Sequence, residues 1–173
     1  MDDRAAALKR SFAPVADERT RLLLLGSLPG EESLARGRYY AHPRNQFWRL
    51  AGAVIAAELE PLPYEARLET LLAAGIGLWD VVASARRRGS LDAAIRDHAP
   101  NALPELAAAL PALRAVGFNG GTSARLGMKM LAGSGLALLS LPSSSPAYTL
   151  SFAAKREAWL ALRPFLDSDP RPS

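Results

Sequence analysis

Residues 21–26 read Arg-Leu-Leu-Leu-Leu-Gly, and this stretch decides the fold class. Four consecutive leucines are typical of a strand that is buried on both faces, and the glycine marks the turn that ends it. Three further apolar runs occupy residues 75–82, 115–118 and 136–141. Because unbroken apolar runs occur in parallel sheets that helices cover, these four segments predict a mostly parallel sheet.

Helical patterns alternate with these strands. Apolar side chains recur at helical spacing in five segments: residues 45–59, 68–72, 101–110, 122–131 and 151–166. Such alternation predicts an α/β protein built from βαβ units. No linker interrupts the pattern, so we expect one domain over residues 1–167, with a helix and an entry loop in about the first 18 residues. Residues 168–173 are polar and contain prolines, which predicts a flexible tail.

The composition excludes several kinds of chemistry. The chain has no cysteine, which rules out disulfides, thiolate zinc sites, iron–sulfur clusters and a cysteine nucleophile. With only His42 and His98, a histidine-built metal centre is not expected, and we predict neither a metal nor another cofactor. No leucine run is long enough to span a bilayer and the start lacks a signal-peptide pattern, which predicts a cytoplasmic protein without membrane partners.

The net charge of +4 comes from arginine, with 18 Arg against 3 Lys. Arginine binds phosphate through two parallel hydrogen bonds, so this excess permits a nucleic-acid partner. A GC-rich coding sequence explains the same excess equally well, and the composition does not decide between the two explanations.

Ligands of open parallel sheets bind beyond the carboxyl ends of the strands, and glycines or polar residues follow each predicted strand here. These positions are residues 26–30, Asp80, residues 119–120 and residues 142–145. Asp80 lies among apolar residues, where a carboxylate is costly unless it is paired. Either an arginine or backbone amides satisfy Asp80, or it awaits a ligand.

Three other segments each allow a structural and a functional interpretation. The arginines at 86–88 form either a solvated loop or a set of phosphate contacts. Asn45 is either the cap of the following helix or part of a polar site, and Tyr40 is either partial core or a stacking surface. The serines at 143–145, between two prolines, form a plain connection or a stiff loop rich in donors.

Several of these segments together resemble the uracil-DNA glycosylase superfamily. Residues 26–48, with a Gly-x-x-Pro turn and a His-Pro-x-Asn-x-Phe-Trp end, resemble its motif 1, and residues 141–148 resemble its second motif. The similarity is closest to the mismatch-specific branch and to the hypoxanthine (deoxyinosine) glycosylases, often called family 6. Residues 77–81, 89–92 and 118–120 also resemble the deoxyinosine group. The resemblance spans about residues 20–165 and implies a three-layer α/β/α sandwich around a four-stranded, mostly parallel sheet.

The chain departs from the superfamily at two positions. Leu28 stands where most members carry the Asp or Asn that places water, and Leu141 stands where the second motif commonly offers His or Asn. The deoxyinosine group resembles this chain in lacking the first residue, and its asparagine falls on Asn45, which the resemblance implies to be catalytic. The departure argues against strong uracil activity. The absence of cysteine separates the chain from the branches that carry an iron–sulfur cluster.

The resemblance implies a monofunctional DNA glycosylase. Such an enzyme flips a deaminated base out of double-stranded DNA, hypoxanthine first and uracil second, and hydrolyses its N-glycosidic bond. It leaves an abasic site for downstream repair enzymes, and we expect a monomer associated with the nucleoid. No lysine lies in the motifs, so a Schiff-base step is not expected. Leu28 keeps open the alternative of a non-catalytic protein that binds damaged DNA. A serine hydrolase is remote, because no Gly-x-Ser-x-Gly elbow is present.

The expected site residues fall into two groups besides Asn45. Those expected to bind the base are Ser27, Leu28, Tyr40, His42, Asp80 and Asn119. Those expected to contact DNA are Arg44, Arg86, Arg87, Arg88, Ser143, Ser144, Ser145, Ala147 and Tyr148. An ionised Asp80 can accept the N1–H of hypoxanthine but has nothing to give the C6 carbonyl, whereas adenine would face it with a lone pair. Uracil presents a similar edge, so pocket size must separate the two lactam bases.

Overall fold

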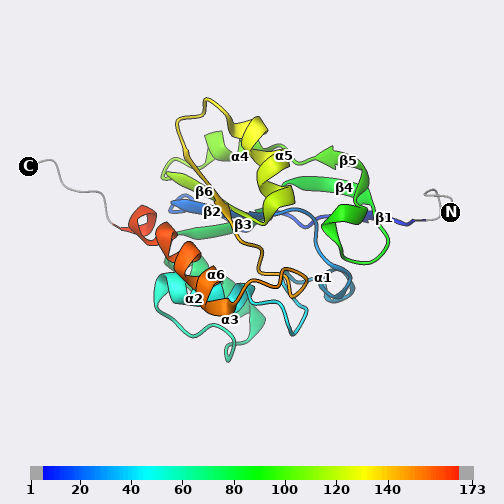
Figure 1. The fold of residues 1–173 in the computed structure, drawn as a ribbon. Helices are drawn as coiled ribbons and strands as arrows, with labels where there is room; N and C mark the ends of the chain where they lie inside the picture. Colours follow the sequence, from blue (N-terminus) through cyan, green and yellow to red (C-terminus); the bar gives the residue numbers. More distant parts are fainter. Residues whose placement is uncertain (1–5, 168–173) are drawn as a thin grey trace, which may run out of the picture.

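A four-stranded parallel sheet forms the centre of the computed structural model, which describes residues 6–167 (Figure 1). Its strands are β2 (Leu22–Gly26), β3 (Ile76–Asp80), β6 (Ala115–Asn119) and β7 (Ala137–Leu141). They lie in the order β3-β2-β6-β7, and each neighbouring pair is parallel. The four predicted strands and their parallel arrangement are therefore confirmed, and their carboxyl ends lie at one edge.

Helices cover both faces of this sheet. One face carries α2 (Phe47–Ile55), α3 (Tyr64–Ala73) and α6 (Phe152–Trp159), and α6 continues into the 3₁₀ helix η3 (Leu160–Leu166). The other face carries α4 (Leu103–Ala109) and α5 (Gly121–Leu131) (Figure 1). This arrangement confirms the three-layer sandwich.

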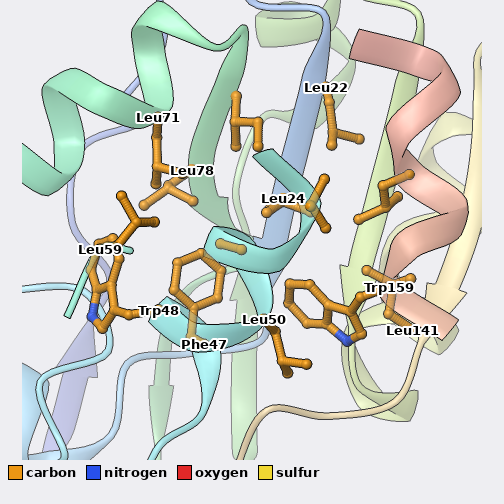
Figure 2. Close-up of a cluster of buried hydrophobic side chains, with 14 of the residues drawn as sticks. Leu22, Leu24, Phe47, Trp48, Leu50, Leu59, Leu71, Leu78, Leu141 and Trp159 are labelled. Carbon is orange, nitrogen blue, oxygen red and sulfur yellow. The ribbon is translucent and has the colours of Figure 1, made fainter. Parts of the chain in front are cut away.

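The leucines of β2 divide between two cores. Leu22 and Leu24 pack with Phe47 of α2 and Trp159 of α6, and Figure 2 shows these side chains facing one another. The alternate leucines at 23 and 25 pack with residues of α4, α5 and β6. Side chains of a strand alternate between its faces, so an unbroken leucine run is what a strand between two helical layers requires.

A second, antiparallel sheet was not predicted. It consists of β1 (Leu8–Arg10), β4 (Val82–Arg86) and β5 (Arg96–Pro100) in the order β1-β4-β5. Residues 6–18 contain no helix, so the helix expected near the N-terminus is wrong where the structure describes it. The 3₁₀ turn η2 (Asp92–Ala94) lies between β4 and β5. These strands are short and partly polar, and none of them is an unbroken apolar run. They form because they hydrogen-bond to one another, which spacing along the sequence does not reveal.

The remaining differences concern element ends. A short helix, α1 (Glu31–Arg36), follows the motif 1 turn, and α2 is shorter than the predicted helix at 45–59 because Ala56 adopts a left-handed backbone with φ 56°. The tail expected at 168–173 lies outside the described residues. Within residues 6–167, no helix combines the length and apolar character needed to cross a membrane.

Candidate active site

The loops that follow the four parallel strands surround a cavity of about 490 Å³. Its wall includes residues 26–30 after β2, Asp80 at the end of β3, Asn119 at the end of β6, and residues 143–148 after β7. Residues 90–92 and several residues between α1 and α2 complete the wall. The volume lies within the range of about 300–1,000 Å³ that is usual for small-ligand pockets. The cavity therefore lies beyond the carboxyl ends of the parallel strands, where a ligand site was predicted.

Asp80 is the most unusual group in the cavity wall. It is only 4% exposed, and its Oδ2 has no hydrogen-bond partner among the described residues. Burial, followed by the like charge of Asp92, raises the pKa of Asp80 to about 7, although Arg87 opposes this shift. No described residue donates a hydrogen bond to Asp80 Oδ2, so pairing with an arginine or backbone amides, one of the two interpretations of Asp80, is not observed there.

Gly26 and Tyr40 lie against this carboxyl. A Cβ atom on Gly26 would stand 2.6 Å from Asp80 Oδ1 and 3.0 Å from the Tyr40 hydroxyl, so only glycine leaves room here. Tyr40 has a left-handed backbone with φ 52°, a conformation that costs energy outside glycine. Its ring stacks on Phe47 with 3.8 Å between the centroids, so Phe47 covers one ring face. Tyr40 is thus both a core residue and part of the cavity wall.

Asn119 and Ser144 form a buried reciprocal pair. The Asn119 Oδ1 accepts from the Ser144 backbone N–H at 2.9 Å, and its Nδ2 donates to the Ser144 hydroxyl at 2.9 Å. The same Nδ2 lies 3.3 Å from the Tyr40 hydroxyl. Its amide is therefore occupied in holding the loop, not free to bind a base. The Ser144 hydroxyl is likewise buried and cannot reach a phosphate, whereas Ser143 and Ser145 remain half-buried on the wall.

Asn45 is not the N-cap of the following helix, which is one of its two interpretations, although its side chain bonds the first residue of that helix. Its Oδ1 accepts from the Phe47 backbone N–H at 2.9 Å at the start of α2, with Gln46 rather than Asn45 in the N-cap position. The Asn45 Nδ2 has no partner among the described residues, and Asn45 lines the cavity. This hydrogen bond fixes the Asn45 amide and leaves its NH₂ available as a donor.

His42 is oriented in a similar way. Its Nδ1 accepts from the Arg44 backbone N–H at 3.1 Å, so a neutral ring carries its proton on Nε2. His42 lines the cavity, and the Arg44 side chain is exposed. Ala147 and Tyr148 are exposed at the cavity rim.

The three arginines at 86–88 do not act alike. Arg87 is 1% exposed, and its guanidinium donates to the carbonyls of Leu28, Pro29 and Gly89. Arg87 is therefore not the phosphate contact that was expected, because its side chain holds the motif 1 turn from inside. Arg86 donates to the Ala6 carbonyl at 3.1 Å and is half-buried, which leaves Arg88 as the exposed member of the three.

Leu28 has a packing role that accounts for its apolar character. It is buried with Val82 and Ala85 of β4, in a small core between the motif 1 turn and the second sheet. Leu28 also borders the cavity, but it offers a base only an apolar surface. An acid at this position would be buried among apolar side chains.

Sequence reasoning assigned no role to Asp92, which the structure places beside motif 1. The Ser27 hydroxyl donates to Asp92 Oδ1 at 2.6 Å, and both residues line the cavity. Burial raises the pKa of Asp92, whereas the Ser27 hydrogen bond and the charge of Arg87 oppose that rise. The similarity of residues 89–92 to the deoxyinosine group was the only signal, because the unpredicted second sheet brings Asp92 here.

Lys155 was expected outside the site, yet it joins two of its loops. This α6 residue is 1% exposed, and its Nζ donates to Gln46 Oε1 at 2.9 Å and to the Ser145 carbonyl at 3.2 Å. The Gln46 backbone N–H donates to the Ser144 carbonyl at 3.0 Å. Lys155 therefore fixes residues 143–145 relative to the Asn45 segment. Within residues 6–167, no cluster of acidic or histidine side chains suits a metal ion.

Comparisons with known proteins agree on one superfamily. The family model described as "Uracil DNA glycosylase superfamily" matches residues 13–163. A hypoxanthine DNA glycosylase of Methanosarcina barkeri is 40% identical over 151 residues, which cover 87% of this chain and 95% of the relative. A hypoxanthine DNA glycosylase of Methanosarcina acetivorans is 42% identical over 156 residues, which cover 90% and 98%. A solution NMR structure from M. acetivorans, provisionally assigned as a uracil DNA glycosylase, is 39% identical with a TM-score of 0.84 and covers 92% of this chain and 99% of that one.

Proposed function

The chain belongs to the uracil DNA glycosylase superfamily, and from this premise we propose that it removes hypoxanthine, and uracil more weakly, from double-stranded DNA. It is a hydrolase acting on N-glycosyl bonds: water adds to the sugar C1′, the base departs, and an abasic site remains for downstream repair enzymes. The observation that carries this proposal is a cavity in which an unpaired buried carboxyl, Asp80, and a free amide donor, Asn45, share one wall.

The base must leave the duplex to reach Asp80, which lies within the cavity wall. Tyr40 would stack on the flipped base through the ring face that Phe47 does not cover. Stacking of a base on an aromatic side chain contributes about 1–3 kcal/mol. Leu28 would add apolar contact, and Asp80 would hydrogen-bond the Watson–Crick edge.

Two donors would stabilise the leaving base. Negative charge builds up on the base as the glycosidic bond breaks, and fixed donors that face this charge lower the barrier. Asn45 offers its free Nδ2–H, and His42 offers Nε2–H because the Arg44 backbone N–H occupies its other nitrogen. Both groups are held by local hydrogen bonds before any ligand arrives, which reduces the reorganisation that the reaction needs.

Asp92 would orient the attacking water in place of the missing motif 1 acid. Its carboxylate is fixed by the Ser27 hydroxyl and lies on the cavity wall. A carboxylate there also favours the positive charge that develops on the sugar. One proton of the water passes to Asp92 as the oxygen bonds to C1′, and the departing base takes up a proton from solvent.

The rim supplies contacts to the DNA strand. The exposed or half-buried members of the expected set are Arg44, Arg86, Arg88, Ser143, Ser145, Ala147 and Tyr148. Of these, the two serines, Ala147 and Tyr148 line the cavity. Tyr148 is exposed and would fill the gap in the base stack. No lysine lines the cavity among the described residues, which supports a glycosylase without a lyase step.

The test uses duplexes that carry one inosine, uracil or xanthine, treated with the protein and then with alkali. We expect alkali-dependent cleavage at inosine, weaker cleavage at uracil, and no strand break without alkali. Asn45→Ala should retain DNA binding and lose about 10²–10³-fold in kcat, as expected when one oxyanion-type donor is removed. Tight binding of the inosine duplex without base release would favour the non-catalytic alternative. Full activity of Asn45→Ala would remove Asn45 from this role.

A further inference from the structure

Two carboxyl groups share the cavity wall but have opposite hydrogen-bond environments. Asp92 Oδ1 accepts a 2.6 Å hydrogen bond from Ser27, which favours the ionised form of Asp92. Asp80 is buried, and no described residue donates to its Oδ2. When two nearby carboxyl groups cannot both be ionised, the proton resides on the one with less stabilisation. That group is Asp80.

The only described charge that favours an ionised Asp80 is that of Arg87, and it is outweighed by burial and by the like charge of Asp92. Arg87, beyond the end of β4, directs its guanidinium to three backbone carbonyls instead of to a carboxylate. Asp92, on η2, contributes a like charge. Tyr39 and Tyr40, from the segment before α2, are neutral phenols whose pKa burial raises. On β6, the side-chain amide of Asn119 is engaged with Ser144, and no described residue donates a hydrogen bond to Asp80 Oδ2.

With the proposed function as its basis, we propose that Asp80 reads the flipped base as a neutral carboxylic acid. Its O–H donates to the C6 carbonyl of hypoxanthine, and its C=O accepts the N1–H. The pair therefore contains two hydrogen bonds where an ionised carboxylate would make one. This replaces the expectation of an ionised Asp80.

The neutral form also suits the chemistry better than the ionised form. The base departs with growing negative charge, part of it on O6, and a carboxylate facing that oxygen would oppose the departure. An O–H donor to O6 strengthens as the charge grows and so stabilises the transition state more than the ground state.

In this pairing Asp80 reads bases with a ring N–H beside a carbonyl. Hypoxanthine and xanthine fit through N1–H and C6=O, and uracil fits through N3–H and C4=O. The normal bases guanine and thymine present the same edge, so their rejection does not rest on Asp80. A neutral acid can also pair with N1 and the amino group of adenine by exchanging its donor and acceptor oxygens. Rejection of adenine then rests on the intact A·T pair and on the poorer leaving group, not on Asp80.

Asp80→Asn is the decisive variant because a carboxamide offers the same donor and acceptor at every pH. We expect Asp80→Asn to excise hypoxanthine within about fivefold of the unmodified protein near pH 6. The unmodified protein should lose about tenfold in kcat/KM per pH unit on the alkaline side, where Asp80 ionises, whereas Asp80→Asn should not. Asp80→Leu, which has neither donor nor acceptor, should lose about 10²-fold or more. An inactive Asp80→Asn, or an Asp80→Leu as active as the unmodified protein, would overturn the proposal.

A second measurement examines Asp80 without relying on turnover. The side-chain carboxyl ¹³C signals of the free protein are titrated by NMR, and the Asp80 signal is assigned by its loss in Asp80→Asn. We expect its midpoint near neutrality, and a lower midpoint in Asp92→Asn because the like charge is gone. A midpoint near 4 would overturn the neutral acid even if the enzyme is active. A midpoint near neutrality with no excision of any base would instead overturn the proposed function. It would also overturn the proposal that Asp80 hydrogen-bonds a flipped base.

Discussion

Gly26 and Asp80 lie opposite each other at the ends of β2 and β3, and this residue pair shapes the base site. The missing Cβ of Gly26 is the space that the Asp80 carboxyl and the Tyr40 hydroxyl occupy. A glycine after a strand therefore serves here to admit a side chain, in addition to allowing close approach of a ligand.

Gly26→Ala should impair excision more than stability. The new methyl group would stand 2.6 Å from Asp80 Oδ1, and the carboxyl, as the end of a side chain, would move away from its reading position. We expect kcat/KM on the inosine duplex to fall at least about tenfold, while urea unfolding shows a loss of about 1–2 kcal/mol. Gly121→Ala is the matched control, because a Cβ there meets nothing within 4 Å. Equal activity of both variants would contradict the role of Gly26.

The protonation of Asp80 also predicts how stability depends on pH. The pKa of Asp80 is about 7 in the folded chain and near 3.8 when unperturbed. The folded state therefore binds the proton more tightly, and its contribution is present below pH 4 and lost as the pH rises to 7. Asp80→Asn carries no titrating proton at this position, so between pH 5 and pH 8 the unmodified protein should lose about 2–3 kcal/mol more stability than the variant. Urea unfolding at the two pH values measures this, and parallel losses would refute it.

The residues that line the cavity were more predictable from the sequence than the groups to which their side chains hydrogen-bond. The position of Asp80 followed from the strand order, and Asn45 followed from the motif. Arg87 and Asn119 have polar side chains of the kind that bind DNA at a surface. Both are buried here, however, and they hydrogen-bond to the backbone of neighbouring loops. Which polar side chain faces a ligand and which faces a carbonyl depends on loop packing, which local spacing does not encode.

At the scale of elements, Lys155 of α6 couples the loop after β7 to the start of α2. The Lys155 ammonium is buried and pairs with no acidic side chain among the described residues, which is costly, and burial lowers its pKa. The two hydrogen bonds of Lys155 indicate that it keeps residues 143–145 in position for the DNA strand.

Lys155→Met should weaken both the loop and the DNA contact. The change keeps the apolar stem but leaves Gln46 Oε1 and the Ser145 carbonyl without their donor, which costs about 1–3 kcal/mol of stability. We expect KM for the inosine duplex to rise more than kcat falls. Lys129→Met removes the same charge from an exposed position on α5 and serves as the control. An identical effect of the two changes on KM would show that only net charge matters.

The helices and strands with a clear apolar run or a clear helical spacing were predictable from the sequence, and the others were not. The four parallel strands and helices α2 to α6 followed from apolar runs and helical spacing. Strands β1, β4 and β5 did not, because only Val81 separates β4 from β3 and because all three strands are stabilised by cross-strand pairing. That second sheet places Arg87 and Asp92 near motif 1, so the missed strands and the missed site residue have one cause.

On the scale of the whole molecule, the cavity opens at one end of the parallel sheet, with exposed Arg44 and Arg88 outside it. The positive net charge has two explanations, coding bias and phosphate binding, and the salt dependence of binding separates them. A contact to phosphate releases counterions, whereas an arginine elsewhere on the surface does not.

Replacing both Arg44 and Arg88 with Gln should lower the slope of log Kd against log salt by about 2, since each phosphate contact contributes about 0.9. The measurement is fluorescence anisotropy with an undamaged duplex at several salt concentrations. Arg125→Gln, on α5 and away from the cavity wall, should leave the slope unchanged. An unchanged slope in the double variant would place the DNA elsewhere.

Glycosylase activity is tested by quantifying free base and abasic sites in the same reaction with an inosine-containing duplex. We predict one molecule of free hypoxanthine for each alkali-labile site, with the strand intact before alkali. Release of a nucleoside or nucleotide, or stable binding of the duplex without any free hypoxanthine, would contradict the assignment of this chain as a DNA glycosylase.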